Sequence, residues 1–243
     1  MLPSIPPDDP RPLTGLPLVT DELGLLASLV PLAGARIVEA GCGAATLARA
    51  LLARFDDAQV VGLEVDERQL AKNLAEPPAP RLTFVNAGAQ AIPFPDASFD
   101  GAMMLKSLHH VPREAMDPAL AELARVVRPG GWLYVSEPVY AGELNELIRL
   151  FNEEREVRAL AQQALDRALA SGRWQAGAEH WFGVPRHFTD FADFERKLMR
   201  PTFADHRIDD ALLARVRERY ARYQTDRGAD FVSPMRARLL QRL

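Results

Sequence analysis

The sequence predicts an α/β fold built on a doubly wound, mostly parallel sheet, and three observations support this class. Strand-like and helical segments alternate from about residue 35 to residue 138. The strand-like segments are apolar along most of their length, which is typical of strands buried on both faces. Prolines and glycines separate the segments. Alternation at this spacing favours a parallel sheet with helices on both faces.

Apolar periodicity locates the elements of this region. Strands are expected at residues 35–40, 58–65, 81–87, 99–105 and 132–138. Helices are expected at residues 46–55, 67–74 and 118–127. In front of them, Thr20 or Asp21 can cap a helix that runs through Leu29. The first fifteen or so residues are rich in proline, which predicts an extended arm.

Beyond Pro138 the pattern changes to long helices. Apolar residues recur at helical spacing over residues 143–170, which predicts one long helix that ends at Gly172. We interpret it as a helical insertion after the fifth strand, acting as a lid, with a homodimer contact as the alternative. Further elements are a helix over 191–199, a strand over 202–208, a helix over 210–223, and a tail (235–243) that suits an edge strand or a helix.

Composition excludes several classes of protein. The chain has 243 residues, 29 Lys plus Arg and 33 Asp plus Glu, giving a net charge of −4 without a sustained basic run. These values argue against a nucleic-acid-binding surface. The single cysteine, Cys42, excludes an internal disulfide and an all-cysteine metal site. The longest apolar stretch, near residues 23–35, is shorter than the ~20 residues of a membrane-spanning helix. The proline-rich, acid-bearing N-terminus does not resemble a signal peptide, so we expect a cytoplasmic protein without a membrane partner.

The first strand and helix are joined by a glycine turn in the sequence IVEAGCGAATLA. Gly41 and Gly43 permit a tight turn and a close approach of a ligand to the backbone. Glu39 stands two residues before Gly41, where its carboxylate would repel a pyrophosphate but suit an ammonium group. The sixth position of the dinucleotide fingerprint carries Thr46 in place of Gly or Ala. A nicotinamide or flavin dinucleotide is therefore disfavoured.

A second acid, Glu64, ends the second strand. The carboxyl ends of parallel strands form the ligand-binding edge of open α/β sheets. A carboxylate at this edge can accept both hydroxyl groups of a ribose. Glu39 and Glu64 together therefore indicate a nucleoside that carries an amino-acid head group.

Four motifs in order resemble the class I S-adenosylmethionine-dependent methyltransferases, of the kind that act on small molecules. The glycine turn resembles the first motif of this family, and VVGLEVDERQLAKN resembles the second. AQAIPFPDASFDGAMML followed by KSLHHV resembles the stretch around the fourth strand. LARVVRPGGWLYVSEP resembles the motif that leads into the fifth. The resemblance covers roughly residues 35–138 and implies a Rossmann-like methyltransferase fold.

The resemblance implies roles for the residues at matching positions. S-adenosyl-L-methionine is the expected cofactor and S-adenosyl-L-homocysteine the product. The cofactor-binding residues are expected to be Glu39, Ala40, Gly41, Cys42, Gly43, Glu64, Val65, Gly88, Ala89, Gln90, Leu105, Lys106 and His110. Glu39 and the glycine turn would hold the methionine part, Glu64 the ribose, and Val65 would pack on the adenine. Leu105 and Lys106 would line the region below the sulfonium.

Two positions depart from the family pattern. The third small position of the glycine turn is Ala45 instead of Gly. Gly88 stands where the family usually carries an Asp for the adenine amino group. Asn86 and Gln90 are the candidates for replacing that contact, and the backbone of Ala89 would meet the adenine edge.

His109 and Glu137 are the expected catalytic residues. His109 follows the fourth strand and Glu137 ends the fifth, so the two side chains can meet at one edge of the sheet. Histidine suits the role of a base because its pKa lies near neutrality. The arrangement is similar to that of some sugar O-methyltransferases of this family. The alternative is that His109 and His110 only pack and cap the loop before Pro112.

Other candidates have simpler interpretations. Trp174, Trp181 and Phe182 could wall a substrate pocket, although aromatic residues at this density more often form core. Cys42 is more readily a small turn residue than a reactive thiol, and residues 215–222 are more readily a solvated helix face than an anion site. His180 and His187 show no metal-ligand spacing, so no metal is expected.

We therefore expect a methyltransferase that acts on a small-molecule acceptor, with O-methylation favoured. The alternative is a protein of the same fold that binds S-adenosylmethionine, or a modified form of it, without transferring a methyl group. The chain is expected to form one domain of 243 residues. Its parts are an N-terminal arm and helix (1–34), a cofactor-binding core (35–138), a helical lid or substrate-side insertion (139–200) and closing elements of the sheet (201–243).

Overall fold

A computed structural model describes residues 15–77, 79–200 and 206–243. The arm predicted over the first fifteen residues therefore lies almost entirely outside the described residues, as does most of the strand predicted over 202–208. The chain divides into two units. The sheet unit consists of Asp21–Glu137, Val157–His180 and Arg236–Leu243, and the second unit holds the remaining residues.

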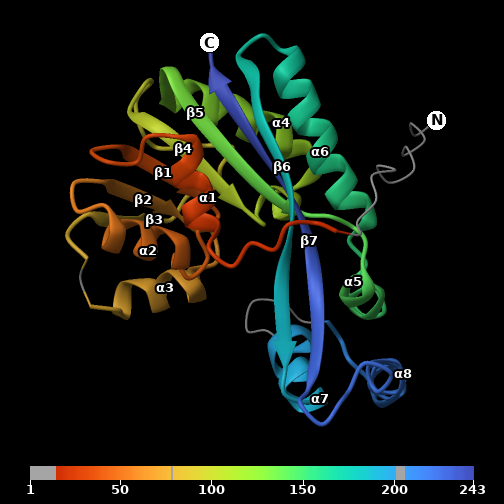
Figure 1. The fold of residues 1–243 in the computed structure, drawn as a ribbon. Coiled ribbons are helices and arrows are strands. Elements are labelled where there is room, and N and C mark those ends of the chain that lie inside the picture. The colour runs from red at the N-terminus through yellow and green to blue at the C-terminus, as the bar shows by residue number, and fades with distance from the viewer. Residues whose placement is uncertain (1–14, 78, 201–205) are drawn as a thin grey trace. The chain divides into compact units, whose positions relative to one another are not determined.

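The sheet unit is organised around a seven-stranded sheet (Figure 1). Its strands are β1 (Arg36–Ala40), β2 (Gln59–Leu63), β3 (Leu82–Val85), β4 (Phe99–Leu105), β5 (Val127–Pro138), β6 (Trp174–Phe188) and β7 (Ala229–Arg242). Their spatial order is β3-β2-β1-β4-β5-β7-β6. The pairs β1–β2, β1–β4, β2–β3 and β4–β5 are parallel. The order reverses beside β1, so the predicted doubly wound, mostly parallel sheet is confirmed.

The described part of the sheet unit contains five α-helices, two of which begin at an aspartate cap. The five helices are α1 (Glu22–Leu29), α2 (Thr46–Arg54), α3 (Glu67–Ala75), α4 (Met116–Val126) and α6 (Arg155–Ala170). Asp21, the second of the two predicted caps, accepts a hydrogen bond from the Gly24 N–H at 2.8 Å. Asp66 caps α3 in the same way by accepting from the Arg68 N–H at 3.0 Å. Each cap satisfies a backbone donor that the helix itself leaves unpaired.

The two faces of the sheet bury different helices. Val38 and Ala40 of β1 belong to one apolar cluster with residues of α4 and α6. Side chains alternate along a strand, so Ile37 and Glu39 point to the opposite face, where α1 and α2 contact one another. This alternation directs the carboxylate of Glu39 toward α2.

The prediction of a single long helix over residues 143–170 is wrong. The segment forms α5 (Glu143–Ile148) and α6, which are separated by residues 149–154 and belong largely to different units. The side chain of Glu153 accepts from the Arg155 N–H at 2.9 Å and from the Tyr140 hydroxyl at 2.8 Å. This carboxylate satisfies a first-turn donor of a new helix. A second helix start therefore lies inside one continuous amphipathic pattern.

The last strands differ from the sequence prediction. The aromatic stretch 174–188 forms β6, a strand of 15 residues that the residue pattern did not predict. For the tail, the strand alternative is confirmed, but β7 lies between β5 and β6 and is not an edge strand. The edge position belongs to β6, which carries Pro185 and Gly183. Proline and polar residues are typical of sheet edges, and they obscure the usual strand pattern.

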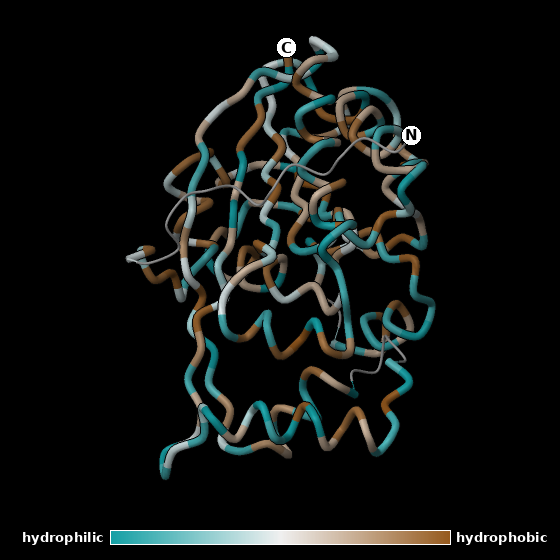
Figure 2. The backbone as a smooth tube through the Cα atoms, turned by 90° about the vertical axis from the view of Figure 1, so that its right-hand side faces the viewer, coloured by the Kyte–Doolittle hydropathy of each residue, from teal (hydrophilic) through white to brown (hydrophobic). Residues whose placement is uncertain are grey.

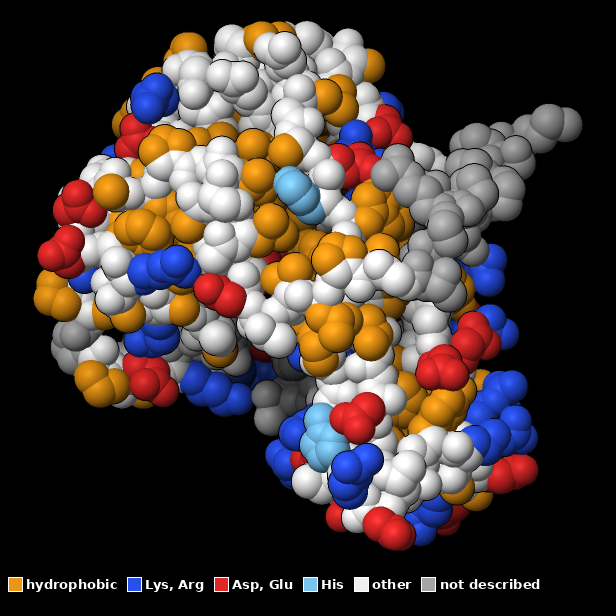
Figure 3. Space-filling view, viewed as in Figure 1, with side chains coloured by type: hydrophobic (Ala, Val, Ile, Leu, Met, Phe, Trp, Pro, Cys, Tyr) orange, Lys and Arg blue, Asp and Glu red, His pale blue; other side chains and the backbone are white. Residues whose placement is uncertain are grey.

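The second unit has its own aromatic core. It contains α5, α7 (Phe191–Phe194), the π-helical turn η3 (Glu195–Met199), α8 (Asp210–Tyr220) and the far halves of β6 and β7. Phe194 lies 5.2 Å from Phe188 and 5.1 Å from Tyr220 between ring centroids. Lys and Arg side chains gather around α8 in Figure 3, as expected of an exposed helix face.

Hydrophobic residues are distributed in short runs along the backbone (Figure 2). Among the described residues, no helix is both long enough and apolar enough to cross a membrane.

Candidate active site

The residues expected to bind the cofactor and to act as base lie at one edge of the sheet unit. Each follows or ends a parallel strand: Glu39 and Ala40 on β1, Glu64 and Val65 after β2, Gly88–Gln90 after β3, Leu105, Lys106, His109 and His110 at or after β4, and Glu137 on β5. Neighbouring parallel strands place their carboxyl ends together. The edge therefore holds acids, imidazoles and flexible glycines side by side.

The glycine turn after β1 is held tightly at Gly41. Gly41 has φ +70°, and its N–H and that of Cys42 each donate to the Leu63 carbonyl at 3.0 Å. A Cβ at position 41 would lie 2.7 Å from the Cβ of Ser107. The Ser107 hydroxyl donates to the Ala40 carbonyl at 2.8 Å. Glycine is therefore needed at position 41 both for its conformation and for the close approach of Ser107.

Asn73 of α3 holds the same turn from the other side. Its side-chain amide donates to the Gly43 carbonyl at 2.7 Å, and its oxygen accepts from Gln69 at 2.9 Å. Asn73 is buried, so these bonds satisfy a polar group away from water. Asn73 belongs to the second of the four motifs, but the motif alone predicts no role for it. An amide on the buried face of a helix was the signal that could have identified it.

Glu39 carries a buried, unpartnered oxygen, which indicates a cationic ligand. The residue is only 4% exposed, and its Oε2 has no hydrogen-bond partner among the described residues. Burial raises the pKa of Glu39 to about 8, while the Ala48 N–H and the charge of Lys106 act in the opposite direction. A buried unpaired carboxylate is costly unless a cation or a proton neutralises it. The site therefore suits an ammonium group.

Glu64 is fixed by two backbone amides. Its two oxygens accept from the Gly43 N–H and the Asp66 N–H, both at 2.8 Å. A carboxylate oxygen has two acceptor positions, so each can also accept a ligand hydroxyl. Val65, the next residue, is 65% exposed, which is unusual for a large aliphatic side chain and leaves an apolar surface for a ring.

Cys42 lies buried between the two acids. Burial, together with the negative charges of Glu39 and Glu64, raises the pKa of the Cys42 thiol well above its usual range. A thiol in such surroundings stays protonated and is a poor nucleophile. The geometry supports the interpretation of Cys42 as a small turn residue.

His109 and Glu137 form a buried pair across the ends of β4 and β5. Leu105 is in register with Ser136, and the Lys106 N–H donates to the Ser136 carbonyl at 2.7 Å. His109 Nδ1 is hydrogen-bonded to one oxygen of Glu137, and the other oxygen accepts from the Leu108 N–H at 2.9 Å. When Nδ1 carries the shared proton, Nε2 holds the lone pair that a base requires.

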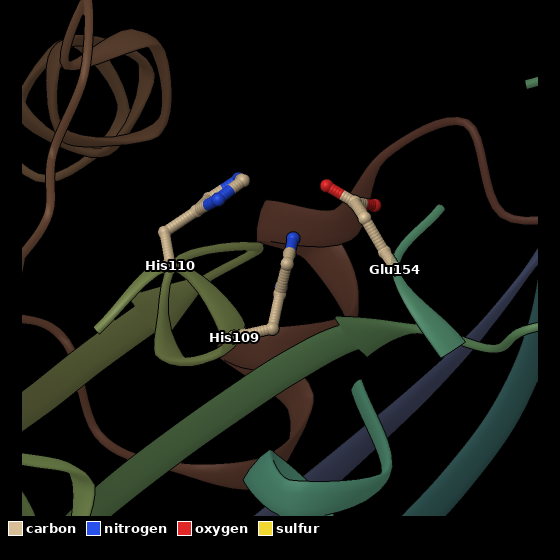
Figure 4. Close-up of side chains that lie close together, drawn as sticks. All are labelled: His109, His110 and Glu154. Carbon is tan, nitrogen blue, oxygen red and sulfur yellow. The ribbon is translucent and has the colours of Figure 1, made fainter. Parts of the chain in front are cut away.

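His110 lies beside His109 but is exposed. Both residues belong to the short turn η1 (Leu108–His110), and their ring centroids are 4.0 Å apart (Figure 4). Figure 4 shows the two imidazole rings rising from the same turn. The buried ring is the one bonded to a carboxylate, and the exposed ring lies beside it.

The aromatic residues of β6 are divided between the two units. Trp174 is buried in the apolar cluster of the sheet unit, and its indole N–H donates to the Leu120 carbonyl at 3.3 Å. Trp181 and Phe182 belong to the second unit. For Trp174, the core interpretation holds.

Comparisons with known proteins concern the core of the chain. Residues 37–131 match the family model described as a methyltransferase domain. The chain is 37% identical over 125 residues to the O-methyltransferase cnsE of Penicillium expansum, covering 50% of this chain and 44% of that protein. It is 37% identical over 119 residues to the 27-O-demethylrifamycin SV methyltransferase of Amycolatopsis mediterranei, covering 46% and 42% respectively.

A solved structure extends the likeness over the whole fold. The YcgJ protein of Bacillus subtilis superposes with a TM-score of 0.62 at 17% identity, covering 91% of this chain and 98% of that one. The fold is that of class I S-adenosylmethionine-dependent methyltransferases. Over residues 37–131 the chain is similar to the methyltransferase domain of this class. The matched region spans about half the length of the curated relatives.

Proposed function

We propose that this protein uses S-adenosylmethionine to methylate a hydroxyl group of a small molecule. The observation that carries the proposal is the buried His109–Glu137 pair at the same sheet edge as Glu39 and Glu64. Curated relatives that match the core are named O-methyltransferases, which supports the same chemistry.

The residues at the edge fit the cofactor. The unpartnered oxygen of Glu39 suits the ammonium group of the methionine part, and Glu64 suits the ribose. Val65 offers an exposed apolar surface to the adenine ring. When bound, S-adenosylmethionine supplies an activated methyl group, so the protein's own work is to align the acceptor and to exclude water.

His109 would then act as the base. Its Nε2 would take the proton of the acceptor hydroxyl, and Glu137 would stabilise the resulting imidazolium through Nδ1. The Leu108 N–H holds Glu137 in place and so fixes the direction of the imidazole. Lys106 and Leu105, at the end of β4, would line the approach to the reacting methyl group.

A small-molecule acceptor fits the surface charge better than a nucleic acid does. The net charge is −4, and the sequence holds no sustained basic run. Nucleic-acid-binding domains usually present a strongly basic face to the phosphates. We therefore place the acceptor among small molecules that carry a hydroxyl group.

Two measurements test the proposal. Titration calorimetry measures binding of S-adenosylmethionine, and release of S-adenosylhomocysteine is then followed over a panel of hydroxyl and amine acceptors. Binding together with turnover on hydroxyl acceptors supports O-methylation, whereas turnover confined to amines contradicts it. Binding without turnover favours the alternative of a protein that binds the cofactor without methylating, for which Gly88 is the motivating departure. Absence of binding contradicts both.

A further inference from the structure

The side-chain space of position 88 is occupied by another residue. A Cβ built on Gly88 would lie 2.4 Å from the Oε1, 2.7 Å from the Nε2 and 2.8 Å from the Cδ of Gln90. These distances are far shorter than any real carbon contact, so a side chain at position 88 and this position of the Gln90 carboxamide exclude one another. Gly88 is not among the residues with positive φ, so its backbone does not require glycine.

The Gln90 carboxamide is available to a ligand. Within the described residues, neither its oxygen nor its nitrogen takes part in a hydrogen bond, and the side chain is exposed. Its backbone neighbours are ordered, since Ala89 is buried and the Ala91 N–H donates to the Gly88 carbonyl at 3.1 Å. A flexible side chain on a fixed turn therefore presents one donor and one acceptor group.

The turn that carries Gly88 and Gln90 lies where the purine of the expected ligand would bind. This turn follows β3, and β3 neighbours β2. The Glu64 N–H donates to the Val85 carbonyl at 3.1 Å, which joins the ends of these two strands. Glu64 and the exposed Val65 thus lie on the strand end next to Gln90.

We propose that the Gln90 carboxamide, occupying the space left by Gly88, binds the six-position edge of the purine and makes this site tolerant of a 6-oxo as well as a 6-amino purine. The inference rests on the proposed function, because it concerns the purine of the same cofactor. It assigns the residue that contacts the purine and the purine selectivity that follows.

The chemistry of the two side-chain types differs at this point. An ionised carboxylate only accepts hydrogen bonds, so at position 88 it would accept from a 6-amino group and repel a 6-oxo group. A carboxamide both donates and accepts, and it can turn to present its oxygen to an amino group or its NH₂ to an oxo group. Gly88 with Gln90 therefore discriminates less between the two purines than an Asp at position 88 would.

The test compares the affinities for S-adenosylhomocysteine and its deaminated analogue, S-inosylhomocysteine, by titration calorimetry on the full chain. Gln90→Ala should weaken S-adenosylhomocysteine binding ~3- to 10-fold, the range of one net hydrogen bond. Gly88→Asp combined with Gln90→Ala should restore that affinity. The double variant should also raise the preference for the adenosyl ligand over the inosyl ligand by ~10-fold relative to the unmodified protein.

A matched control is Gln59→Ala, because Gln59 is an exposed glutamine at the opposite end of β2. It should leave both affinities unchanged. If Gln90→Ala binds S-adenosylhomocysteine as tightly as the unmodified protein does, the inference is overturned while the proposed function stands. If the double variant shows no greater preference for the adenosyl ligand, the selectivity is overturned. If the unmodified protein binds neither ligand, the proposed function fails and the inference with it.

Discussion

Glu137 holds the imidazole of His109 and the backbone that carries it with a single carboxylate. One oxygen is bonded to Nδ1 of His109, and the other accepts from the Leu108 N–H at 2.9 Å. Both residues are almost completely buried, at 5% and 1% exposure. A buried carboxylate with both oxygens engaged fixes the side chain that is bonded to it, and a fixed imidazole is what base catalysis requires.

Replacing Glu137 with Gln should lower turnover without loss of the cofactor. The amide keeps an oxygen that can accept from Leu108 but loses the charge that stabilises an imidazolium. We expect kcat to fall by ~10²- to 10⁴-fold, the usual contribution of a general base, in Glu137→Gln and also in His109→Ala. The affinity for S-adenosylhomocysteine, measured by calorimetry, should change less than about threefold because neither residue is expected to contact that ligand's polar groups.

The control is a second histidine–acid pair outside this edge. His187 Nδ1 lies 2.8 Å from Asp230 in the second unit, and both side chains are exposed. Asp230→Asn should leave kcat unchanged. Full turnover in both Glu137→Gln and His109→Ala would show that this pair does not supply the catalytic base.

The affinity for S-adenosylhomocysteine should rise with pH because of Glu39. Burial raises the pKa of Glu39 to about 8, so the ligand-free protein holds this carboxyl mostly protonated at neutral pH. The ammonium group of the ligand binds the ionised form, so binding expels a proton. Affinity should therefore rise ~10-fold from pH 6 to 7 and ~5-fold from pH 7 to 8, as the ionised fraction increases.

Calorimetry in buffers with different heats of protonation counts the released proton directly. Glu39→Gln carries no titrating group at this position, so its affinity should be lower and independent of pH over this range. A flat pH profile in the unmodified protein would show that Glu39 does not hold the ammonium group.

Variants of Glu64 and Asn73 distinguish the loss of a ligand contact from the loss of order in the glycine turn. Both bind Gly43, Glu64 through the N–H and Asn73 through the carbonyl. Only Glu64 is expected to bind the ribose hydroxyls. Asn73→Ala should weaken S-adenosylhomocysteine binding by less than ~10-fold, and Glu64→Ala by at least ~10-fold more, since it also loses charge-assisted hydrogen bonds. Equal losses in the two variants would mean that Glu64 acts only on the turn.

Gly41→Ala should destabilise the protein more than Gly172→Ala does. The two glycines have nearly the same φ, +70° and +72°, so both variants bear the left-handed strain of ~1–2 kcal/mol. A Cβ at position 172 meets nothing within 4 Å, whereas at position 41 it meets Ser107. We expect ~1–3 kcal/mol of additional loss in Gly41→Ala from this overlap, measured as the free energy of unfolding in urea. A similar loss in both variants would contradict the close packing at Ser107.

The class of fold and the edge that holds the candidate site were predictable from the sequence. Short apolar runs between Gly- and Pro-marked turns specify buried strands through local composition, and β1 to β4 follow them closely. The strand predicted over 132–138 begins earlier, at Val127, because β5 continues through the Pro-Gly-Gly run, where a turn is expected. Parallel topology then brings Glu39, Glu64 and Glu137 to one edge, since the carboxyl ends of all five strands meet there. Asp21 is likewise a local signal, because a cap acts within three residues of itself.

Several features required the tertiary structure. The amphipathic pattern over 143–170 continues across the break between α5 and α6, and the cap at Glu153 is supported by Tyr140, 13 positions away. The anchor of the glycine turn by Asn73 joins residues 30 positions apart, and the bond from Ser107 to Ala40 joins residues 67 apart. Neither pairing has a periodic signature.

A parallel α/β sheet with acids and imidazoles at its carboxyl edge can be predicted from the order of the residues, because strand burial and turn chemistry are encoded residue by residue. Which of those groups touch one another depends on how the chain packs. Side-chain contacts such as His109 with Glu137, and the occupation of the space at Gly88 by Gln90, depend on register and rotamer in the packed chain. Packing selects these from alternatives that look the same in one dimension.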